Sequence, residues 1–595
     1  MINIVNNTVK KVTFIAVFLA FCFSYGCDDM LDRNPQGRLS ESVFTTKAAI
    51  EKLLISCYSP LSGMTSASPG GQGNIGGWQS SPDNMYYGDM GPGNMHKGST
   101  TGDQASFLLQ ERFLATSDNI PNPLTKWNVM YAAIDRCNDV LRTLNENEIS
   151  DLSDADRNQI IAEARYLRGY YHFEVKKMWN MVPYIDETVT DLQRRVPNDR
   201  DIWPFIEADF LFAANTLPPA QAEPGRPTNW AAKAFLAKAY LFQQKYSDAK
   251  PLVDDIIING PHQLNENYFD NFNAENNNGI ESVWQNQVAV NVAGAGFHRS
   301  QRGGDLAYPS GSGIPALTGA GFNQPTFDLV NAFKTGTDGL PLIDTFWEEE
   351  FHNDMDVLPT QPFQPDMTTP VDPRLDWTVG RRGVPFHDWG LHGEGIDWIR
   401  DRASAGPYNQ KKMIILRSQM DRYAHLGEAK FNAMNFNIIR YAQVLLWAAE
   451  CEIEIGDPEK AREYVNMIRA RARDGYYVRL GEDAPFGDGP TAANYVVDEY
   501  KESWAGRDKD WMRKRVRFEH RLEFALEGHY FFDLIRWNVD VEYINAYIGR
   551  EKGRITYLND VVYTINKRYL PIPLQQIDRS YLNGAPTLTQ NNYEY

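Results

Sequence analysis

Residues 449–468 read AECEIEIGDPEKAREYVNMI, and they carry the clearest signal of the fold in the chain. Apolar and small residues recur at spacings of three and four on both sides of a central Gly456-Asp457-Pro458, as in two amphipathic helices. Gly456 can take the left-handed conformation that ends a helix, Asp457 can cap the next helix, and Pro458 suits its first turn. The stretch therefore predicts a helical hairpin.

The same pattern occurs 212 residues earlier (449 minus 237). In both copies the small and large residues follow the order of a tetratricopeptide helix pair, in which small residues let the helices approach and larger residues fill the seam. The matched positions are Ala237, Ala249, Val253 and Ile256 in the first copy and Ala449, Ala461, Val465 and Ile468 in the second. We expect a mainly α fold with a tetratricopeptide-like helix-hairpin frame.

Two longer helices are expected upstream of the first hairpin. Apolar residues from 127 to 144 recur at helical spacing and would lie on one helix face. The next helix would begin at Ser153, which has Asp156 three residues later in a capping-box pattern, and would continue to Trp179.

A loop-rich insertion separates the two hairpins. Residues 261–430 are rich in Gly, Pro, Asn and aromatic residues, and they contain only short strand-like pieces such as 281–288, where Trp284 is expected to be a core residue. The helical frame would cover about 36–260 and 431–595. Because binding residues tend to lie on loops held by a rigid scaffold, we expect function in this insertion and in the irregular stretch 62–98.

The N-terminus has the pattern of an export signal. Lys10 and Lys11 precede a mainly apolar run that ends at Phe23, which is shorter than the roughly 20 residues that span a bilayer. The small-residue exit leads directly to Cys27, so residues 1–26 resemble a bacterial lipoprotein signal peptide that leaves Cys27 acylated at the mature N-terminus. The alternative is an ordinary secretory signal with an incidental cysteine.

Composition limits the partners of the chain. The formal charge is −18, and removal of the two signal-peptide lysines would make it −20. Such a surface repels phosphate backbones, so we expect no nucleic-acid partner. Cys57, Cys137 and Cys451 lack zinc-site spacing and are expected to be buried free thiols, and we predict no metal and no cofactor.

Six motifs resemble one family in sequence order. They are LDRNPQGRLSESVFTTKAAIEKLLISCYSPL (31–61), EARYLRGYYHFEVKKMWNMVPYIDE (163–187), GRPTNWAAKAFLAKAYLFQQKYSDA (225–249), FNIIRYAQVLLWAAECEIEIGD (436–457), EHRLEFALEGHYFFDLIRW (519–537) and RYLPIPLQQID (568–578). The chain looks like a member of the SusD/RagB family of outer-membrane nutrient-binding lipoproteins of Bacteroidetes, and the motifs cover most of it.

The resemblance implies a lipoprotein that is held in the outer membrane by its lipid anchor alone and faces the cell exterior. Asp28 and Asp29 resemble the surface-export signal of such lipoproteins. The protein would capture an oligosaccharide or polysaccharide and deliver it to a SusC-like TonB-dependent transporter. Three alternatives stay open: a RagB-like peptide-capturing lipoprotein, a surface glycoside hydrolase, and a tetratricopeptide scaffold that binds only protein.

Catalytic patterns are absent from the sequence. It contains no HExxH, GxSxG or P-loop, and the GxGxxG match at 71–76 lacks the flanking strand and helix of a dinucleotide site. Residues 348–350 are three glutamates, which we interpret as a solvated helix face. Glu519, Glu523 and Glu527 lie one helical turn apart near Arg521 and Arg536, which indicates structural ion pairing. We predict no catalytic residues.

Aromatic residues in loop-like sequence are the best candidates for ligand contact. A sugar ring can stack on a flat aromatic face while nearby amides and carboxylates bind its hydroxyls. Trp78 is the first choice because it follows a Gly-rich loop. The candidate ligand-binding residues are Trp78, Asp83, Asn84, Tyr86, Tyr87, Tyr308, Trp347, Trp389 and Trp398.

Overall fold

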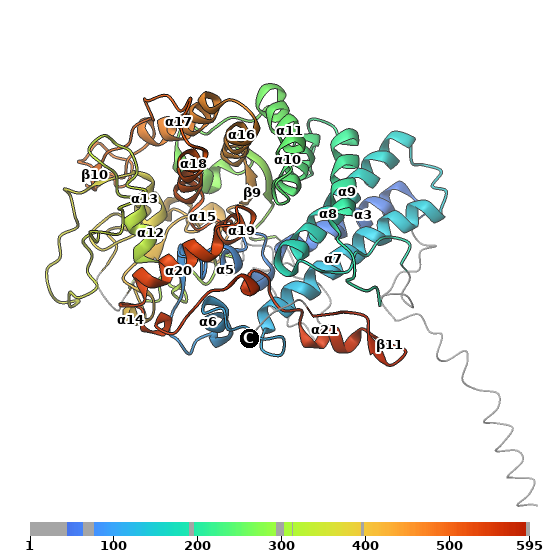
Figure 1. The fold of residues 1–595 in the computed structure, drawn as a ribbon, viewed down its shortest axis with the longest axis horizontal. Helices are drawn as coiled ribbons and strands as arrows, with labels where there is room; N and C mark the ends of the chain where they lie inside the picture. The colour runs from blue at the N-terminus through green and yellow to red at the C-terminus, as the bar shows by residue number, and fades with distance from the viewer. Residues whose placement is uncertain are drawn as a thin grey trace, which may run out of the picture.

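A row of long helices forms the frame of the protein (Figure 1). The computed structural model describes residues 45–63, 77–189, 195–292, 303–311, 313–393 and 398–590. The long helices are α3 (Lys47–Tyr58), α7 (Pro121–Glu146), α8 (Asp154–Trp179), α9 (Trp203–Thr216), α10 (Asn229–Leu241), α11 (Tyr246–Asn259), α16 (Tyr441–Ile455), α17 (Pro458–Asp474), α18 (Lys509–Phe524) and α20 (Asp540–Glu551).

The frame places the two predicted hairpins side by side. Each helix from α7 to α11 packs against the next, and α11 then packs against α16, although residues 260–440 lie between them in the sequence. The matched alanines Ala237, Ala249, Ala449 and Ala461 are all fully buried. The predicted mainly α fold with a tetratricopeptide-like frame is confirmed.

Most of the predicted helix ends are correct. Ser153 Oγ accepts a hydrogen bond from the Asp156 backbone N–H (3.2 Å), and Asp457 Oδ1 accepts one from the Glu459 N–H (2.9 Å). Both side chains therefore cap the helices α8 and α17, and Pro458 is the first residue of α17.

The expected role of Gly456 is wrong. Its φ is −128°, which is outside the left-handed region. A Cβ at this position would lie 1.8 Å from Glu452 Oε2, the atom that accepts a hydrogen bond from the Asp457 N–H (2.8 Å). Gly456 thus provides space for the Glu452 carboxylate at the turn.

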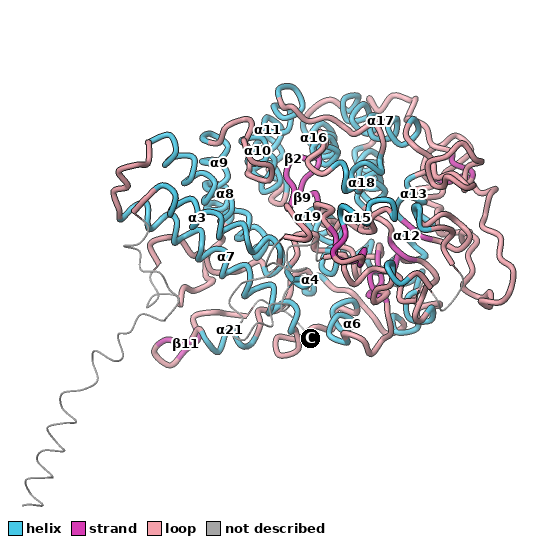
Figure 2. Tube along the Cα trace, turned by 180° about the vertical axis from the view of Figure 1, so that it is seen from behind, coloured by secondary structure: helices cyan, strands magenta, loops and turns pink. Residues whose placement is uncertain are grey.

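The strands of the described residues are short and form two-stranded pairs. Figure 2 shows most of them among the loops of the half that holds α12, α13 and α15. The antiparallel pairs are β1 (Met95–Gly98) with β3 (Phe322–Pro325), β2 (Ser282–Asn286) with β9 (Phe436–Arg440), β5 (Val379–Gly380) with β6 (Asn409–Gln410), β7 (Ala424–His425) with β8 (Glu428–Asn432) and β11 (Tyr581–Leu582) with β12 (Ala585–Pro586); β4 (Pro370–Val371) is parallel to β10 (Asn494–Tyr495).

The pair β2–β9 closes the loop-rich region, because it joins the strand after α11 to the strand before α16. Trp284 on β2 is buried, and its Nε1–H donates to the Gly225 carbonyl (3.0 Å), so its predicted core position is confirmed.

Short helices fill much of the remaining chain: α4 (Gly77–Ser80), α5 (Met85–Gly88), α6 (Ala105–Glu111), α12 (Phe327–Ala332), α13 (Arg374–Thr378), α14 (Arg402–Ala405), α15 (Met420–Tyr423), α19 (Tyr530–Arg536) and α21 (Leu574–Arg579).

Several predictions concern segments outside the described residues. The signal peptide, Cys27 and the glycines of 71–76 all lie there. The division of the chain at 260 and 430 stays a prediction.

Within the ranges that the structure describes, Cys57, Cys137 and Cys451 are buried and form no disulfide, and no helix combines the length and apolar character needed to cross a bilayer.

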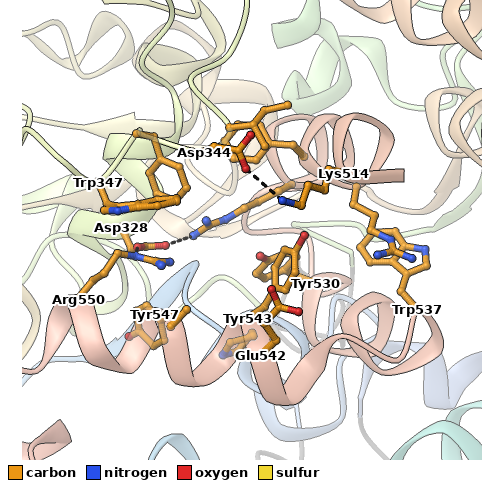
Figure 3. A pocket seen from close by; sticks show the side chains of 17 residues that line it. Asp328, Asp344, Trp347, Lys514, Tyr530, Trp537, Glu542, Tyr543, Tyr547 and Arg550 are labelled. Atoms are coloured by element: carbon orange, nitrogen blue, oxygen red, sulfur yellow. Dashed lines mark hydrogen bonds and ion pairs between the residues drawn. The ribbon is translucent and has the colours of Figure 1, made fainter. Parts of the chain in front are cut away.

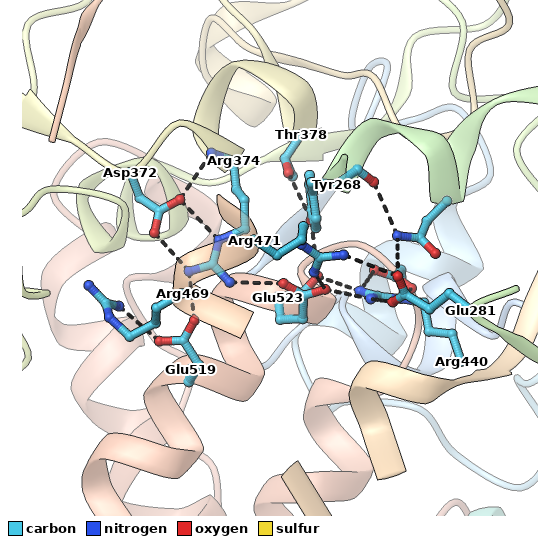
Figure 4. A network of polar contacts seen from close by, with 12 residues as sticks. Tyr268, Glu281, Asp372, Arg374, Thr378, Arg440, Arg469, Arg471, Glu519 and Glu523 are labelled. Atoms are coloured by element: carbon cyan, nitrogen blue, oxygen red, sulfur yellow. Dashed lines mark hydrogen bonds and ion pairs between the residues drawn. The ribbon is translucent and has the colours of Figure 1, made fainter. Parts of the chain in front are cut away.

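A buried ionic network joins the loop-rich region to the frame (Figure 4). Glu523 of α18 accepts hydrogen bonds from Arg374 of α13 (2.9 Å), Arg440 of β9 (2.5 Å) and Arg471 of α17 (2.5 Å). Burial alone would raise the pKa of Glu523, but the three guanidinium groups hold it well below its usual range. The charged form of Glu523 is therefore the stable one.

The charges of this network balance. Glu519 bonds Arg374 (2.7 Å) and Arg469 (3.0 Å), while Glu527 bonds Arg440 (2.9 Å) and Lys412 (2.8 Å). The buried acids are Glu281, Asp372, Glu519, Glu523 and Glu527, and the buried cations are Arg374, Lys412, Arg440, Arg469 and Arg471.

Glu519 and Glu523 of α18 and Glu527 just after it are ion-paired as predicted, but the predicted partners are wrong. Arg521 lies two residues from both Glu519 and Glu523, so its side chain projects from another face of α18. It bonds Asp328 there (2.7 Å). Arg536 bonds Glu450 (2.6 Å) of α16. Sequence spacing identified the face of the helix and missed cations that are distant in sequence.

Substitution of Glu523 by Gln should lower the free energy of unfolding by about 3–5 kcal/mol at neutral pH, because it removes the one carboxylate that three buried guanidinium groups share and leaves the network with a surplus positive charge. The ionic stabilisation is present above the pKa of an unfolded glutamate, about 4.3, and is lost as pH falls through the lower folded pKa. The difference between wild type and variant should therefore shrink at acid pH in urea titrations. Glu463→Gln, at an exposed position on α17, is the matched control; an equal loss in the two variants would contradict the account.

Candidate functional site

The structure buries most of the aromatic residues that the sequence suggests for ligand contact. Trp78 is half-buried, and Trp347 is 42% exposed. The others present almost no surface to solvent: Tyr86, Tyr87, Tyr308, Trp389 and Trp398, together with the polar candidates Asp83 and Asn84. A buried ring offers no open face for a sugar in this conformation.

Trp78, Tyr86 and Tyr87 lie close together as one packed cluster. The Trp78 ring lies 5.8 Å from Tyr86 and 5.0 Å from Phe107, measured between centroids, and Tyr86 stacks on Phe107 at 4.4 Å. The Tyr87 hydroxyl donates to the Gln79 carbonyl (2.9 Å). The structure brings these residues together, and they use most of their surface to hold α4, α5 and α6 against one another.

The polar candidates next to this cluster bind protein groups. Asp83 accepts hydrogen bonds from Ser81 Oγ (2.6 Å) and the Met85 N–H (3.3 Å), and burial raises the pKa of its carboxyl. Asn84 donates to Glu174 (3.0 Å) and accepts from Lys126 Nζ (3.0 Å). Their hydrogen-bonding capacity is thus largely used inside the protein.

The three buried aromatic candidates of the insertion hold irregular backbone in place. The Tyr308 hydroxyl donates to the Met413 carbonyl (3.2 Å), and Trp389 Nε1–H donates to the Ile415 carbonyl (2.8 Å). Trp398 packs against Phe386, with centroids 5.0 Å apart. Buried Tyr and Trp need a partner for their polar atom, and backbone carbonyls of loops supply it here.

Trp347 lines a cleft between α18, α20 and the turn at 341–347, which we call the Trp347 cleft (Figure 3). The cleft has a volume of about 130 Å³. Its aromatic lining is Phe346, Trp347, Phe518, Tyr530, Trp537, Tyr543 and Tyr547, and its charged lining is Asp328, Asp344, Lys514, Arg517, Arg521, Glu542 and Arg550. Aromatic and charged side chains thus meet in one solvent-accessible hollow.

A buried histidine helps to fix the α20 wall of this cleft. The ring nitrogens of His96 lie 2.8 Å from Glu111 and 3.0 Å from Glu551, the last residue of α20. Burial alone would lower the pKa of His96, but the hydrogen bonds to both carboxylates raise it to about 9. Glu551 also accepts from the Phe327 N–H (3.0 Å), so α20 is tied to β1 and α12.

Charged side chains on the floor of the cleft are held in place. Asp328 bonds both Arg521 (2.7 Å) and Arg550. Burial would raise the pKa of Asp328, but the two guanidinium groups hold it below its usual range. Asp328 therefore stays ionised and is a poor general acid, and the arrangement suits binding by ring contact and hydrogen bonds.

Sequence reasoning missed most of the cleft. Tyr543 and Tyr547 sit one turn apart on α20, followed by Arg550, and a tyrosine face of this kind on an amphipathic helix is a usable signal. Tyr530 and Trp537 lie at α19, in a segment whose residues we interpreted as helix-packing and ion-pair positions.

The three glutamates at 348–350 lie in an exposed turn, so the expected helix there is wrong.

The comparisons with known proteins agree on one family. The model of the "SusD family" matches residues 280–595, and the model described as "Starch-binding associating with outer membrane" matches residues 75–241. SusD-like protein P25 of Formosa agariphila is 24% identical over 97% of this chain and 98% of its own length.

Solved structures share the fold. A SusD superfamily protein from Bacteroides vulgatus aligns with a TM-score of 0.65 at 20% identity, covering 92% of this chain and 99% of that one. Surface glycan-binding protein A from Bacteroides thetaiotaomicron, solved with laminarihexaose, aligns with a TM-score of 0.61 at 21% identity, covering 92% of this chain and 100% of that one.

Proposed function

The chain belongs to the SusD family, and from this premise we propose that it is a cell-surface lipoprotein that captures an oligosaccharide for import. The single observation that carries the binding role is the Trp347 cleft, where an indole with 42% of its surface exposed lies 5.1 Å from the Arg550 guanidinium group, in a hollow that is also lined by tyrosines. Aromatic rings with a few polar groups at their edge suit the apolar face and the hydroxyl rim of a sugar. Trp78, the other candidate that is only partly buried, is the second platform that we propose.

The proposal is a binding role without catalysis. A glycosidase of the usual type needs two carboxyl groups across the sugar, one of them protonated. The ion pairs of Asp328 with Arg521 and Arg550 favour its ionised form and so support binding over hydrolysis. Appearance of product sugars on incubation with the wild type would favour the hydrolase alternative instead.

We also propose that the ligand passes to a SusC-like TonB-dependent transporter of the outer membrane. Affinity alone would be enough for the lipoprotein, because the transporter supplies the energy for import. Family membership supports this partner, as it supports the rival role of peptide capture on the RagB model. Glycan and peptide arrays, used side by side, distinguish these two ligand classes.

Trp347→Ala should weaken binding of the best glycan-array hit by roughly tenfold or more, because loss of an aromatic anchor costs on the order of 1–3 kcal/mol. Isothermal titration measures the change, and circular dichroism checks the fold. Tyr581→Ala, at a 49% exposed aromatic outside the cleft, is the matched control and should bind like the wild type.

Trp78→Ala completes this series. If it weakens binding while Trp347→Ala does not, the ligand lies at the Trp78 cluster and the assignment to the Trp347 cleft is wrong. If neither substitution changes the affinity for a glycan that binds the wild type, both platforms are excluded.

Cys27→Ala should leave the signal peptide uncleaved or the protein soluble, because acylation of Cys27 would be its only membrane attachment. The measurement is fractionation of cells with a labelled fatty acid, and Cys22→Ala, within the signal itself, is the control. Unchanged fractionation of Cys27→Ala with the outer membrane, and no label on the wild type, would contradict the lipoprotein proposal.

A further inference from the structure

The Trp347 cleft is locally positive in a strongly negative chain. The formal charge of the whole sequence is −18. The cleft, by contrast, is lined by the cations Lys514, Arg517, Arg521 and Arg550 and by fewer acids, namely Asp328, Asp344 and Glu542. A site for a neutral sugar has no need of this excess of cations.

Pairing inside the cleft leaves part of this positive charge uncompensated. Arg521 and Arg550 share a single carboxylate, Asp328, so together the three groups carry a net positive charge. Lys514 and Asp344 form a neutral, exposed pair (3.2 Å). Asp328 and Asp344 are thus both ion-paired.

Arg517 is the cation that is free to bind a ligand. No carboxylate of the described chain lies within ion-pair distance of its guanidinium group, which sits 5.5 Å from the centroid of the Trp537 ring. Glu542, the acid at the start of the opposite helix α20, is exposed and forms no ion pair with a described residue. Arg517 can therefore turn its donors toward a group in the cleft.

We propose that the Trp347 cleft binds an acidic saccharide, whose carboxylate or sulfate group is bound by Arg517 and whose ring lies against Trp347. This inference rests on the proposed function, which it deepens by naming the ligand class. Guanidinium groups match the geometry of oxyanions and form charge-assisted hydrogen bonds with them. The cleft is open to solvent, so the rest of the saccharide chain would extend over its rim.

The test uses two pairs of probes that share a sugar backbone and differ in the charge of its substituents. They are sulfated laminarihexaose against laminarihexaose, and hexagalacturonate against its full methyl ester, each titrated into the full-length protein by calorimetry. At least one charged probe should bind tenfold or more tightly than its neutral partner. Its affinity should fall as salt is raised, because added ions screen charge interactions.

Protein variants assign the effect to the cleft. Arg517→Gln should weaken the charged probe roughly tenfold and leave the neutral one unchanged. Arg513→Gln is the matched control, because Arg513 lies one turn earlier on α18 and bonds Glu454 (2.6 Å) outside the cleft. Circular dichroism verifies the fold of both variants.

The titrations with the four probes and the variants have distinct outcomes. Preference for the sulfated or for the uronate probe identifies the source of the anionic group. Equal affinity for charged and neutral probes, with binding still lost in Trp347→Ala, overturns the acidic-ligand inference and leaves glycan capture standing. Equal weakening by Arg513→Gln and Arg517→Gln overturns the assignment to Arg517. Failure of all four probes overturns the inference, and failure of the whole glycan array overturns the proposed function with it.

Discussion

The buried carboxylate of Glu523 ties the loop-rich region to the helical frame. A charge inside a protein is stable only when it is paired and hydrogen-bonded, and Glu523 draws its partners from three separate elements, α13, β9 and α17. Those elements come from the insertion, its closing strand and the second hairpin. The network therefore fixes how the loop-rich region sits on the frame (Figure 4).

The helix that carries this network also forms the candidate site. One face of α18 directs Glu519 and Glu523 into the buried network, and other positions place Lys514, Arg517 and Arg521 in the Trp347 cleft. The opposite wall, α20, is tied down through the His96–Glu551 contact (3.0 Å). Both walls of the cleft are thus held before any ligand arrives, which lowers the cost of ordering side chains on binding.

Local sequence predicted the frame well, because helix periodicity and end signals are short-range. The Asp457 cap, the Pro458 start and the buried Ala449 all follow from neighbours within a few residues. The role of Gly456 was missed because it depends on where the Glu452 side chain goes. Helical spacing likewise found the glutamate face of α18 but not its partners, which approach from distant parts of the chain.

The candidate site was harder to predict, because exposure is a property of tertiary packing. Trp389 and Trp347 both stand in loop-like sequence, yet one donates to a buried carbonyl and the other is 42% exposed. Tyr543 and Tyr547 form a tyrosine face that the sequence shows, but this face becomes the wall of a cleft only where α18 lies opposite it. Local sequence does not distinguish the exposed Trp347 from the buried Trp389.

We propose that this SusD-family chain captures its glycan in the Trp347 cleft. A crystal structure of the protein with its best-binding oligosaccharide tests this most directly. We expect sugar density between α18, α20 and the turn at 341–347, with a ring against Trp347. A well-ordered sugar bound elsewhere, with the cleft empty, would contradict it.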